Sequence, residues 1–348
     1  MRSIIYTICK NKTESLEKEW DGNMATIRDV AKKANAGLGT VSRALNGTGY
    51  VSAETRKKIM KAAVELGYDI PVRKINKQED REKIAGVLIP DVSLPFYGNF
   101  VKYVDIELAN AGYKTMIYNT LGVQGRVSEA IELAEKGIIQ GIIINADVTD
   151  EERKRLQKIP AVSFERLLGG KIPFVTSEHR LGGRRAGEIL YQNRCMNVLI
   201  ITARHMTKVY ADYRIEECRN YLEKRGVKVT VAEFAPSNIS VVTVQEIARQ
   251  YMELYHNVDG IFSDDVVAYC CLQYARQMEI NVPRDLKIVG YDGDDIFKLS
   301  IPRITTIRQD VNRIAEVCVE LIQKKISGER LEKEYYIPVK VEKGGTTQ

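Results

Sequence analysis

The sequence predicts a small all-α head that carries a helix-turn-helix, followed by a larger α/β core of two lobes, each a parallel sheet flanked by helices. Three observations predict this fold class. Residues 25–47, ATIRDVAKKANAGLGTVSRALNG, hold two short helical patterns on either side of a tight turn. From Ile84 onward, short apolar runs alternate with amphipathic segments, which is typical of parallel sheets covered by helices. The 348 residues and 44% hydrophobic content are sufficient for more than one domain.

The head follows a polar segment that lacks clear periodicity. Residues 1–23 are interpreted as a disordered arm or as an artefact of an upstream start codon, and residues 24–70 as the helix-turn-helix domain. Thr26 is placed to cap the first helix, a second helix begins near Leu38, and Ser52 is placed to cap a third helix that Gly67 ends.

A charged linker, residues 71–83, joins the head to the core; it begins at a proline and has almost no apolar periodicity. The first lobe is predicted to contain residues 84–194 and 308–336, and the second lobe residues 195–307 and 337–348. Strands are expected to begin at Ile84, Tyr113, Gly141, Ala161, Asn197, Val227, Gly260, Lys287 and Tyr335. Ligands of such sheets bind beyond the carboxyl ends of the strands.

The positive charge of the chain is concentrated in the head. Between Met24 and Asn76, ten Lys and Arg residues stand against four acidic residues, and this excess equals the formal net charge of +6 for the whole chain. A basic head on a neutral body indicates a polyanionic partner for the head alone.

In a helix-turn-helix the second helix enters the major groove of DNA, and here it presents Arg43, which can bind guanine through two donors. Hydroxyl groups and lysines around it can hold phosphates. The alternative is a three-helix bundle with an ordinary solvated basic face. The predicted DNA contacts are Thr26, Arg28, Leu38, Gly39, Thr40, Ser42, Arg43, Asn46, Tyr50, Ser52 and Thr55.

Several side chains suited to sugar binding follow the predicted strands. Sugars need flat apolar faces for their ring C–H groups and planar charged groups for adjacent hydroxyls. The candidates are Asp91, Phe96, Arg166, Arg214, Asp264 and Asp292. Taken singly, Phe96 is also interpretable as a core residue, Arg214 as a surface ion pair and Asp264 as a helix cap.

Catalytic and metal-binding patterns are not visible in the sequence. The three histidines, His179, His205 and His256, lack metal-ligand spacing, and there is no GxSxG or Walker motif. The acidic residues Asp292, Asp294 and Asp295 are an alternative divalent-cation site, although a hydroxyl acceptor at Asp292 is favoured. We therefore expect no enzyme activity, no cofactor and no metal.

The six cysteines show no CxxC spacing and are expected to be reduced and buried. The apolar run from Ile4 to Cys9 is too short for a signal sequence or a membrane span, so a cytoplasmic protein is expected.

The segments TIRDVAKKANAGLGTVSRALNG and VSAETRKKIMKAAVELGY resemble the DNA-binding head of the LacI/GalR family of bacterial repressors. The resemblance continues through GVLIPDVSLPFY, DGIFSDD, VPRDLKIVGYDG and ITTIRQD, and so covers the chain from Met24 onward. RALNGTGYVSAET and FVTSEHRLGGRRAG resemble repressors of sucrose-type operons in particular. The resemblance implies a core like that of periplasmic sugar-binding proteins, homodimers on near-palindromic double-stranded operators, and effector contacts at Phe96, Arg214, Asp264 and Asp292, with Gln309 near the cleft.

The sequence departs from this family at three places. Asn35, Ala36 and Gly37 replace the usual Gly-Val-Ser of the turn; Asn tolerates a left-handed conformation, but a serine hydroxyl is lost. In the linker, Lys77 stands where the family wedges a leucine into the minor groove, and Lys74 where it has an alanine. Glu217 and Cys218 replace a Gly-Phe pair after Arg214, so the helix there packs differently under the pocket.

The sequence therefore predicts a sugar-responsive transcriptional repressor. Two alternatives remain open at this point: the same DNA-binding regulator with a nucleobase or phosphosugar corepressor, and a carbohydrate-binding protein or sugar-modifying enzyme with an incidental helical head.

Overall fold

The computed structural model describes residues 26–46, 51–66, 68, 82–204, 209–235 and 241–348. The expected arm (residues 1–23), residues 71–81 of the expected linker with Lys74 and Lys77, and the positions of Tyr50 and Gly67 lie outside the described residues. Lys83, the last residue of the expected linker, is the first residue of a strand. The chain divides into two compact units, residues 1–81 and 82–348, and we describe each by itself.

The head contains three helices: α2 (Ile27–Ala34), α3 (Leu38–Asn46) and α4 (Ala53–Glu65). Thr26 and Asp29 form a capping box at the start of α2, because the Thr26 backbone N–H and hydroxyl both donate to the Asp29 carboxylate, at 2.8 and 2.6 Å. At its other end Asn35 adopts φ 48°, the left-handed conformation that the turn requires. The Thr55 N–H donates to Ser52 Oγ at 3.3 Å, which confirms the third cap.

A small apolar core holds the head together. Its buried side chains come from all three helices and are Val30, Ala31, Val41, Ala44, Leu45, Ile59, Ala62 and Ala63. Arg56 also joins α4 to α3, since its guanidinium donates to the Ala44 carbonyl at 2.9 Å. This packing fixes which face of α3 remains exposed.

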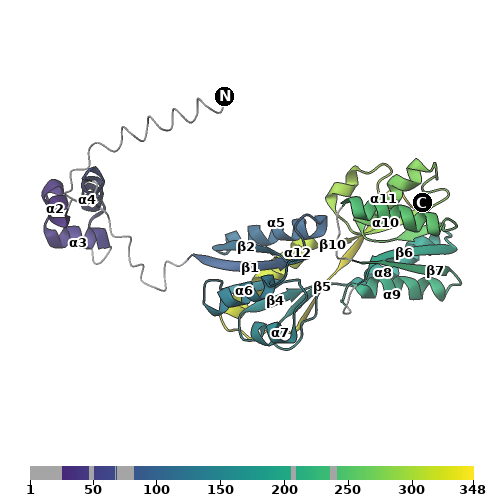
Figure 1. Ribbon diagram of the computed structural model, residues 1–348, viewed down its shortest axis with the longest axis horizontal. Helices are drawn as coiled ribbons and strands as arrows, with labels where there is room; N and C mark the ends of the chain where they lie inside the picture. Colours follow the sequence, from purple (N-terminus) through teal and green to yellow (C-terminus); the bar gives the residue numbers. More distant parts are fainter. Residues whose placement is uncertain (1–25, 47–50, 67, 69–81, 205–208, 236–240) are drawn as a thin grey trace, which may run out of the picture. The chain divides into compact units, whose positions relative to one another are not determined.

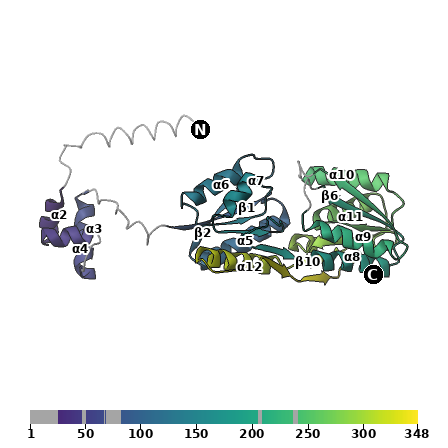
Figure 2. The same ribbon diagram turned by 90° about the horizontal axis from the view of Figure 1, so that it is seen from below.

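The first lobe is a six-stranded parallel sheet in the order β11-β5-β4-β3-β1-β2. Its strands are β1 (Lys83–Ile89), β2 (Tyr113–Asn119), β3 (Gly141–Ile144), β4 (Ala161–Phe164), β5 (Phe174–Ser177) and β11 (Glu334–Ile337). Helices α5 (Pro95–Asn110) and α12 (Val311–Ile326) cover one face, and α6 (Arg126–Glu135) and α7 (Asp150–Leu156) cover the other (Figure 2). Strands β3, β4 and β5 are buried along their whole length, as expected where both faces of a sheet are covered.

The second lobe has the same plan, with the strand order β12-β10-β9-β8-β6-β7. Its strands are β6 (Asn197–Ala203), β7 (Lys228–Phe234), β8 (Gly260–Phe262), β9 (Lys287–Asp292), β10 (Thr305–Gln309) and β12 (Val339–Glu342), of which β12 alone is antiparallel to its neighbour. Helices α8 (His179–Gln192) and α9 (Asp212–Glu223) cover one face, and α10 (Val241–Leu254) and α11 (Asp265–Gln277) the other. A short 3-10 helix, η2 (Asp295–Leu299), follows β9.

The chain crosses between the lobes three times: between β5 and α8, between β10 and α12, and between β11 and β12. Helix α12 consequently lies beside α5 in the first lobe, although it follows five strands of the second sheet, β6 to β10, in sequence (Figure 1). The sequence-based boundary at residue 194 differs from this arrangement. Helix α8 packs on α9 and on the second sheet through Ala186 and Leu190, so the first crossing precedes it.

The sequence-based prediction also omitted two strands and treated two further strands as one. Strands β5 and β10 were not expected, and the expected strand from Tyr335 is two strands, β11 and β12, on either side of Pro338. Proline lacks the N–H that would continue the ladder, and the chain changes sheets there. Within the described residues, no helix has the length and apolar character needed to span a membrane.

Candidate ligand-binding site

A cavity of about 190 Å³ lies between the two lobes. Its polar lining comes mainly from the carboxyl ends of strands in both sheets: Asn145 after β3, Glu165 and Arg166 after β4, Thr202 in β6, Asp264 after β8, Asp292 at the end of β9 and Gln309 at the end of β10. Leu94, Phe96, Tyr97, Val209, Phe234 and Val244 add apolar surface. Both sheets thus present their carboxyl ends to one space, as doubly wound sheets do.

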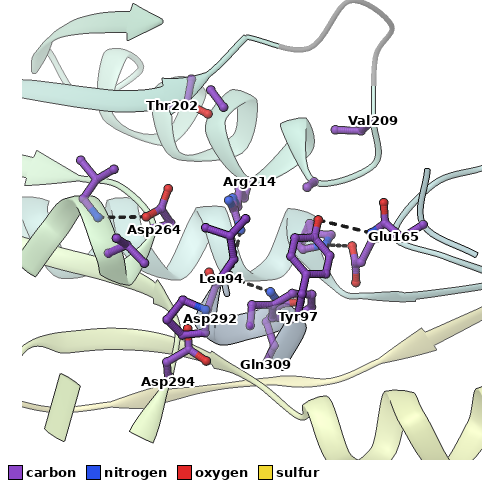
Figure 3. A pocket seen from close by; sticks show the side chains of 18 of the residues that line it. Leu94, Tyr97, Glu165, Thr202, Val209, Arg214, Asp264, Asp292, Asp294 and Gln309 are labelled. Atoms are coloured by element: carbon purple, nitrogen blue, oxygen red, sulfur yellow. Dashed lines mark hydrogen bonds and ion pairs between the residues drawn. The ribbon is translucent and has the colours of Figure 1, made fainter. Parts of the chain in front are cut away.

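Arg214 and Asp292 form the charged centre of the second-lobe wall (Figure 3). The Arg214 guanidinium donates to Asp292 Oδ1 at 3.3 Å, and the Gln309 amide donates to the same oxygen at 2.7 Å. Both charged side chains are largely buried, with 17% and 13% exposure. Burial raises the pKa of Asp292 well above its usual value, and the Arg214 charge opposes that rise.

The loop that carries Asp292 is fixed from beneath by Asp265, the first residue of α11. Its Oδ2 accepts from the N–H groups of Gly293 and Asp294, at 2.8 and 2.9 Å. Gly290 makes room for this contact, since a Cβ there would lie 2.1 Å from Asp265 Oδ1. Asp292 itself is held at φ 107°, a strained conformation for a residue with a Cβ, which fixes its side-chain direction.

Arg214 is positioned by the close approach of α8 and α9. A Cβ on Gly183 would lie 2.0 Å from the Arg214 carbonyl oxygen, so only glycine permits this separation of the two helices. The guanidinium then stacks over the Tyr291 ring, 4.4 Å from its centre. Cys218, on the following turn of α9, is fully buried in the core between α8, α9 and the second sheet.

The first-lobe wall contains a hydrogen-bonded row of side chains. Arg166 Nε donates to Asn145 Oδ1 at 3.0 Å, and Asn145 Nδ2 donates to the Tyr97 hydroxyl at 3.4 Å. Burial raises the pKa of Tyr97 to about 12, so its hydroxyl keeps its proton. Phe96 packs edge to face on Tyr97, with ring centres 5.2 Å apart, and belongs to the lobe core as well as to the cavity.

Glu165, His179 and Tyr291 form a buried chain that joins the lobes beside the cavity. His179 Nε2 bonds the Glu165 carboxylate, and Nδ1 bonds the Tyr291 hydroxyl at 2.9 Å. Glu165 also accepts from Thr176 and from the Ser177 N–H, at 2.9 and 3.0 Å. These partners lower the pKa of Glu165 although burial alone would raise it. The carboxylate therefore remains ionised inside the protein.

Asp264 both caps a helix and lines the cavity, the two alternatives considered for it from the sequence. Its side chain accepts from the Val267 N–H at 3.0 Å and caps α11, and it also lines the cavity. Burial raises its pKa, against the effect of the cap and of Arg214.

Six of the seven side chains predicted to bind an effector line this cavity: Phe96, Arg166, Arg214, Asp264, Asp292 and Gln309. Asp91 does not. It accepts from the Ser93 N–H at 2.8 Å and shapes the turn before α5, so its place after β1 is structural. The sequence missed Tyr97, Asn145, Glu165, His179 and Asp294, although Asn145 and Glu165 obey the same strand-end rule.

The acidic group suggested as a cation site is divided between different partners. Asp292 faces Arg214, and Asp295 pairs with Lys298 and Arg308, at 2.6 and 2.9 Å. Asp294 instead accepts from Asn99 of the first lobe. The three carboxylates therefore do not converge on one point.

In the head, Leu38, Gly39 and Arg43 of α3 are exposed, whereas Val41 and Leu45 are buried, as the sequence indicated. Thr26, Arg28 and Ser52 are also exposed, and Thr40, Ser42 and Thr55 are partly so. The Thr26 hydroxyl is engaged by Asp29. Asn46 is the last residue of α3. The proposed groove-facing side of α3 is thus accessible.

Both the head and the core match known protein families. Residues 26–70 match the family model described as bacterial regulatory proteins, lacI family, and residues 188–347 match the periplasmic binding protein-like domain. The sucrose operon repressor of Streptococcus mutans is 32% identical, over 91% of this chain and 97% of its own length. The ribose operon repressor of Halalkalibacterium halodurans is 30% identical, over 93% and 98%. A periplasmic binding protein/LacI transcriptional regulator from Alkaliphilus metalliredigens, solved with D-xylulofuranose, has a TM-score of 0.70 and 26% identity over 77% of this chain and 100% of its own.

A helix-turn-helix head joined to a two-lobed core with a polar cleft defines a DNA-binding transcription regulator that responds to a small molecule. The chain belongs to the lacI family of bacterial regulatory proteins.

Proposed function

We propose that this regulator represses an operon for sugar use and that an uncharged sugar, bound in the cleft, controls its hold on the operator. The observation that carries the proposal is the group formed by Arg214, Asp292 and Gln309 opposite the aromatic side chains of the first lobe. Charged groups that already share a hydrogen bond can bind adjacent hydroxyls, and Phe96 and Tyr97 offer faces for ring C–H groups.

The charge of the cavity argues against the phosphosugar alternative. Among the described lining residues, the carboxylates Glu165, Asp264, Asp292 and Asp294 outnumber the guanidinium groups of Arg166 and Arg214. Both guanidinium groups are already paired, Arg214 with Asp292 and Arg166 with Asp147. In the described part of the lining, a phosphate would therefore find both guanidinium groups already engaged by carboxylates.

The names of the similar proteins suggest which sugars to test first. The two relatives are named for the sucrose and ribose operons, and the solved structure holds a five-carbon sugar. We expect a homodimer acting in the cytoplasm, without enzymatic activity or a cofactor, and release of DNA on sugar binding. The mechanism is a shift between two dimer arrangements, which requires the sugar to bind one of them more tightly.

Two measurements test this function. Binding of the purified chain to DNA from upstream of its own gene cluster, followed by fluorescence anisotropy, is expected to exceed binding to unrelated DNA and to weaken when the sugar is added. Thermal unfolding is expected to shift upward with sucrose or D-ribose and not with D-ribose 5-phosphate or hypoxanthine. A shift with the phosphate or the purine alone would replace the proposed effector, and a lack of preference for any DNA fragment would remove the proposed function.

A further inference from the structure

Besides the Glu165–His179 pair, a second side-chain hydrogen bond joins the lobes at the edge of the cavity. Asn99 Nδ2, on α5 of the first lobe, donates to Asp294 Oδ1, in the loop after β9 of the second lobe, at 3.0 Å. Asp294 is only 5% exposed, and its other oxygen, Oδ2, is buried without a hydrogen-bond partner among the described residues. The contact joins the two lobes next to the crossing between β10 and α12, because Asn99 and Asp294 belong to different lobes and share a small cavity with Asp310.

The surroundings of Asp294 do not satisfy this second oxygen. Asp265 binds the backbone of Asp294 and not its carboxylate, and Arg308 directs its guanidinium to the Gly293 carbonyl, Asp295 and Glu342. The small cavity behind the carboxylate, about 50 Å³, is polar. The titratable and charged groups packed around it are Tyr103 of α5, Asp264 and Asp265 at the start of α11, Asp292 at the end of β9, Asp295 at the start of η2, Arg308 of β10 and Asp310 before α12.

We propose that Asp294 is a positioning residue that sets the balance between open and closed lobes: closure buries its carboxylate against Asn99 with one oxygen unsatisfied, so the charged side chain opposes closure. When the lobes part, both oxygens become hydrated and the cost disappears. An effector that binds the closed form must overcome this cost. Asp294 thereby raises the sugar concentration needed for a response. The role concerns the same cleft as the proposed function but does not depend on which ligand fills it.

Protonation gives the proposal a measurable signature. Burial raises the pKa of Asp294 to about 6 with the lobes together, against the Asn99 bond and Arg308, which lower it. In open lobes the hydrated carboxylate returns toward its ordinary pKa of about 4. The closed form consequently binds the proton more tightly, and closure becomes more favourable as the pH falls through 6. By linkage the ratio of closed to open forms rises about fourfold between about pH 7.5 and pH 5.5.

Asp265 also titrates in this range, since burial raises its pKa to about 7. Its partners, Gly293, Asp294 and Thr306, all belong to the second lobe and remain in place when the lobes part. Its titration therefore adds equally to both forms and does not favour closure.

The experiment measures closure without any ligand. Nitroxide labels are placed at Gln124→Cys and Arg204→Cys, which follow β2 and β6 on opposite lobes, in a Cys9→Ser background of the full chain diluted with unlabelled chain. The remaining cysteines are buried. Distances from electron double resonance are expected to shift to the shorter population on going from pH 7.5 to 5.5. Asp294→Asn is expected to show that shorter population at both pH values.

Two further variants complete the test. Asp295→Asn is the matched control: Lys298 and Arg308 lower its pKa to about 2, so it should keep the wild-type pH response. Asn99→Leu removes the donor that favours the charged closed form, so it should lower the closed-to-open ratio at pH 7.5 and steepen the rise of that ratio toward pH 5.5, because the Asn99 bond lowers the pKa of Asp294. Any sugar that shifts thermal unfolding, sucrose or D-ribose, should gain up to about fourfold in affinity at pH 5.5 in the unsubstituted chain relative to Asp294→Asn, and this arm alone rests on the proposed function. A flat wild-type distance distribution, or an unchanged pH response in Asp294→Asn, would overturn the proposal.

Discussion

At the scale of single residues, the ligand-binding wall depends on a buried ion pair. Arg214 and Asp292 form an ion pair at 3.3 Å. Asp292 adopts the strained φ of 107°, and the surrounding structure has to stabilise this conformation. Removing one partner leaves the other charge buried without compensation. We therefore expect sugar binding to depend on both partners of the pair.

We predict that Asp292→Ala abolishes the sugar-induced shift in thermal unfolding and weakens sugar binding about tenfold to a hundredfold, because a charge-assisted hydrogen bond contributes about 1.5–3 kcal/mol. Isothermal titration measures the loss. Asp91→Asn is the control, since Asp91 only shapes the turn before α5 and its replacement should retain the response. Equal losses in both variants would show that the wall is not the binding surface.

Arg43 is the second residue on which function is expected to depend. It is exposed on α3, next to the buried Ala44 and Leu45, so its replacement does not disturb the head core. Arg43→Ala is expected to weaken operator binding by about 1–3 kcal/mol, the value of a bidentate guanine contact, and to affect unrelated DNA much less. Anisotropy titrations on both DNAs check this ratio. A uniform loss on both would reduce Arg43 to a phosphate contact.

Some residues that line the cavity could have been predicted from their position in the sequence, and others could not. Asn145 and Glu165 directly follow strands, so the expectation that ligands bind beyond the carboxyl ends of strands, which selected Arg166, also applies to them. His179 was not, because its role depends on Glu165 and Tyr291, which are distant in sequence and meet only when the two lobes assemble. Tyr97 lies beside Phe96 on the first turn of α5, where only the direction of the side chain separates a core residue from a lining one.

At the scale of elements, α8 is the feature that positions the second-lobe wall. Its glycines allow α9 and Tyr291 to approach, and a Cβ on Gly183 would meet the Arg214 backbone at 2.0 Å. We predict that Gly183→Ala costs about 1–3 kcal/mol of unfolding free energy through overpacking and also weakens sugar binding, since it displaces Arg214. Gly187→Ala is the matched control: its nearest contact is 3.1 Å, and the gain in helix propensity offsets most of the strain. Thermal unfolding that ranks the two variants in the opposite order would contradict this account.

The elements most visible in the sequence were those with long apolar patterns. Strands β1, β6 and β7 are seven residues each and were found, whereas β5 (FVTS) and β10 (TTIRQ) are short and rich in polar residues. The hydroxyls of β10 are nonetheless buried and paired, since Thr306 bonds Asp265 and Thr305 bonds Thr347. Such a strand is stabilised by side-chain partners that local hydrophobicity does not register.

At the scale of the whole molecule, the two-lobed plan was predictable because it follows from the alternation of strands and helices. The positions where the chain crosses between the lobes were less predictable from the sequence. Nothing local distinguishes α8 as the first helix of the second lobe, and its assignment comes from the packing of Ala186 and Leu190 on that lobe. The crossings matter for the cleft, since they are the segments that connect its two walls.

The linker supplies the last prediction, which rests on sequence alone. Lys77 stands where the family wedges a leucine between base steps, and Lys74 where it has an alanine. A lysine cannot unstack bases as an apolar side chain does, but it binds the narrow, negative minor groove. We predict that the operator complex is bent less than in relatives with the leucine, and that Lys77→Leu increases the bend in a circular-permutation gel assay. In a dimer the same variant loses two cationic contacts, so the slope of log affinity against log salt should fall by up to about 1.8. A strong central kink in the unsubstituted complex, or a salt slope that Lys77→Leu leaves unchanged, would show that these lysines do not contact the groove.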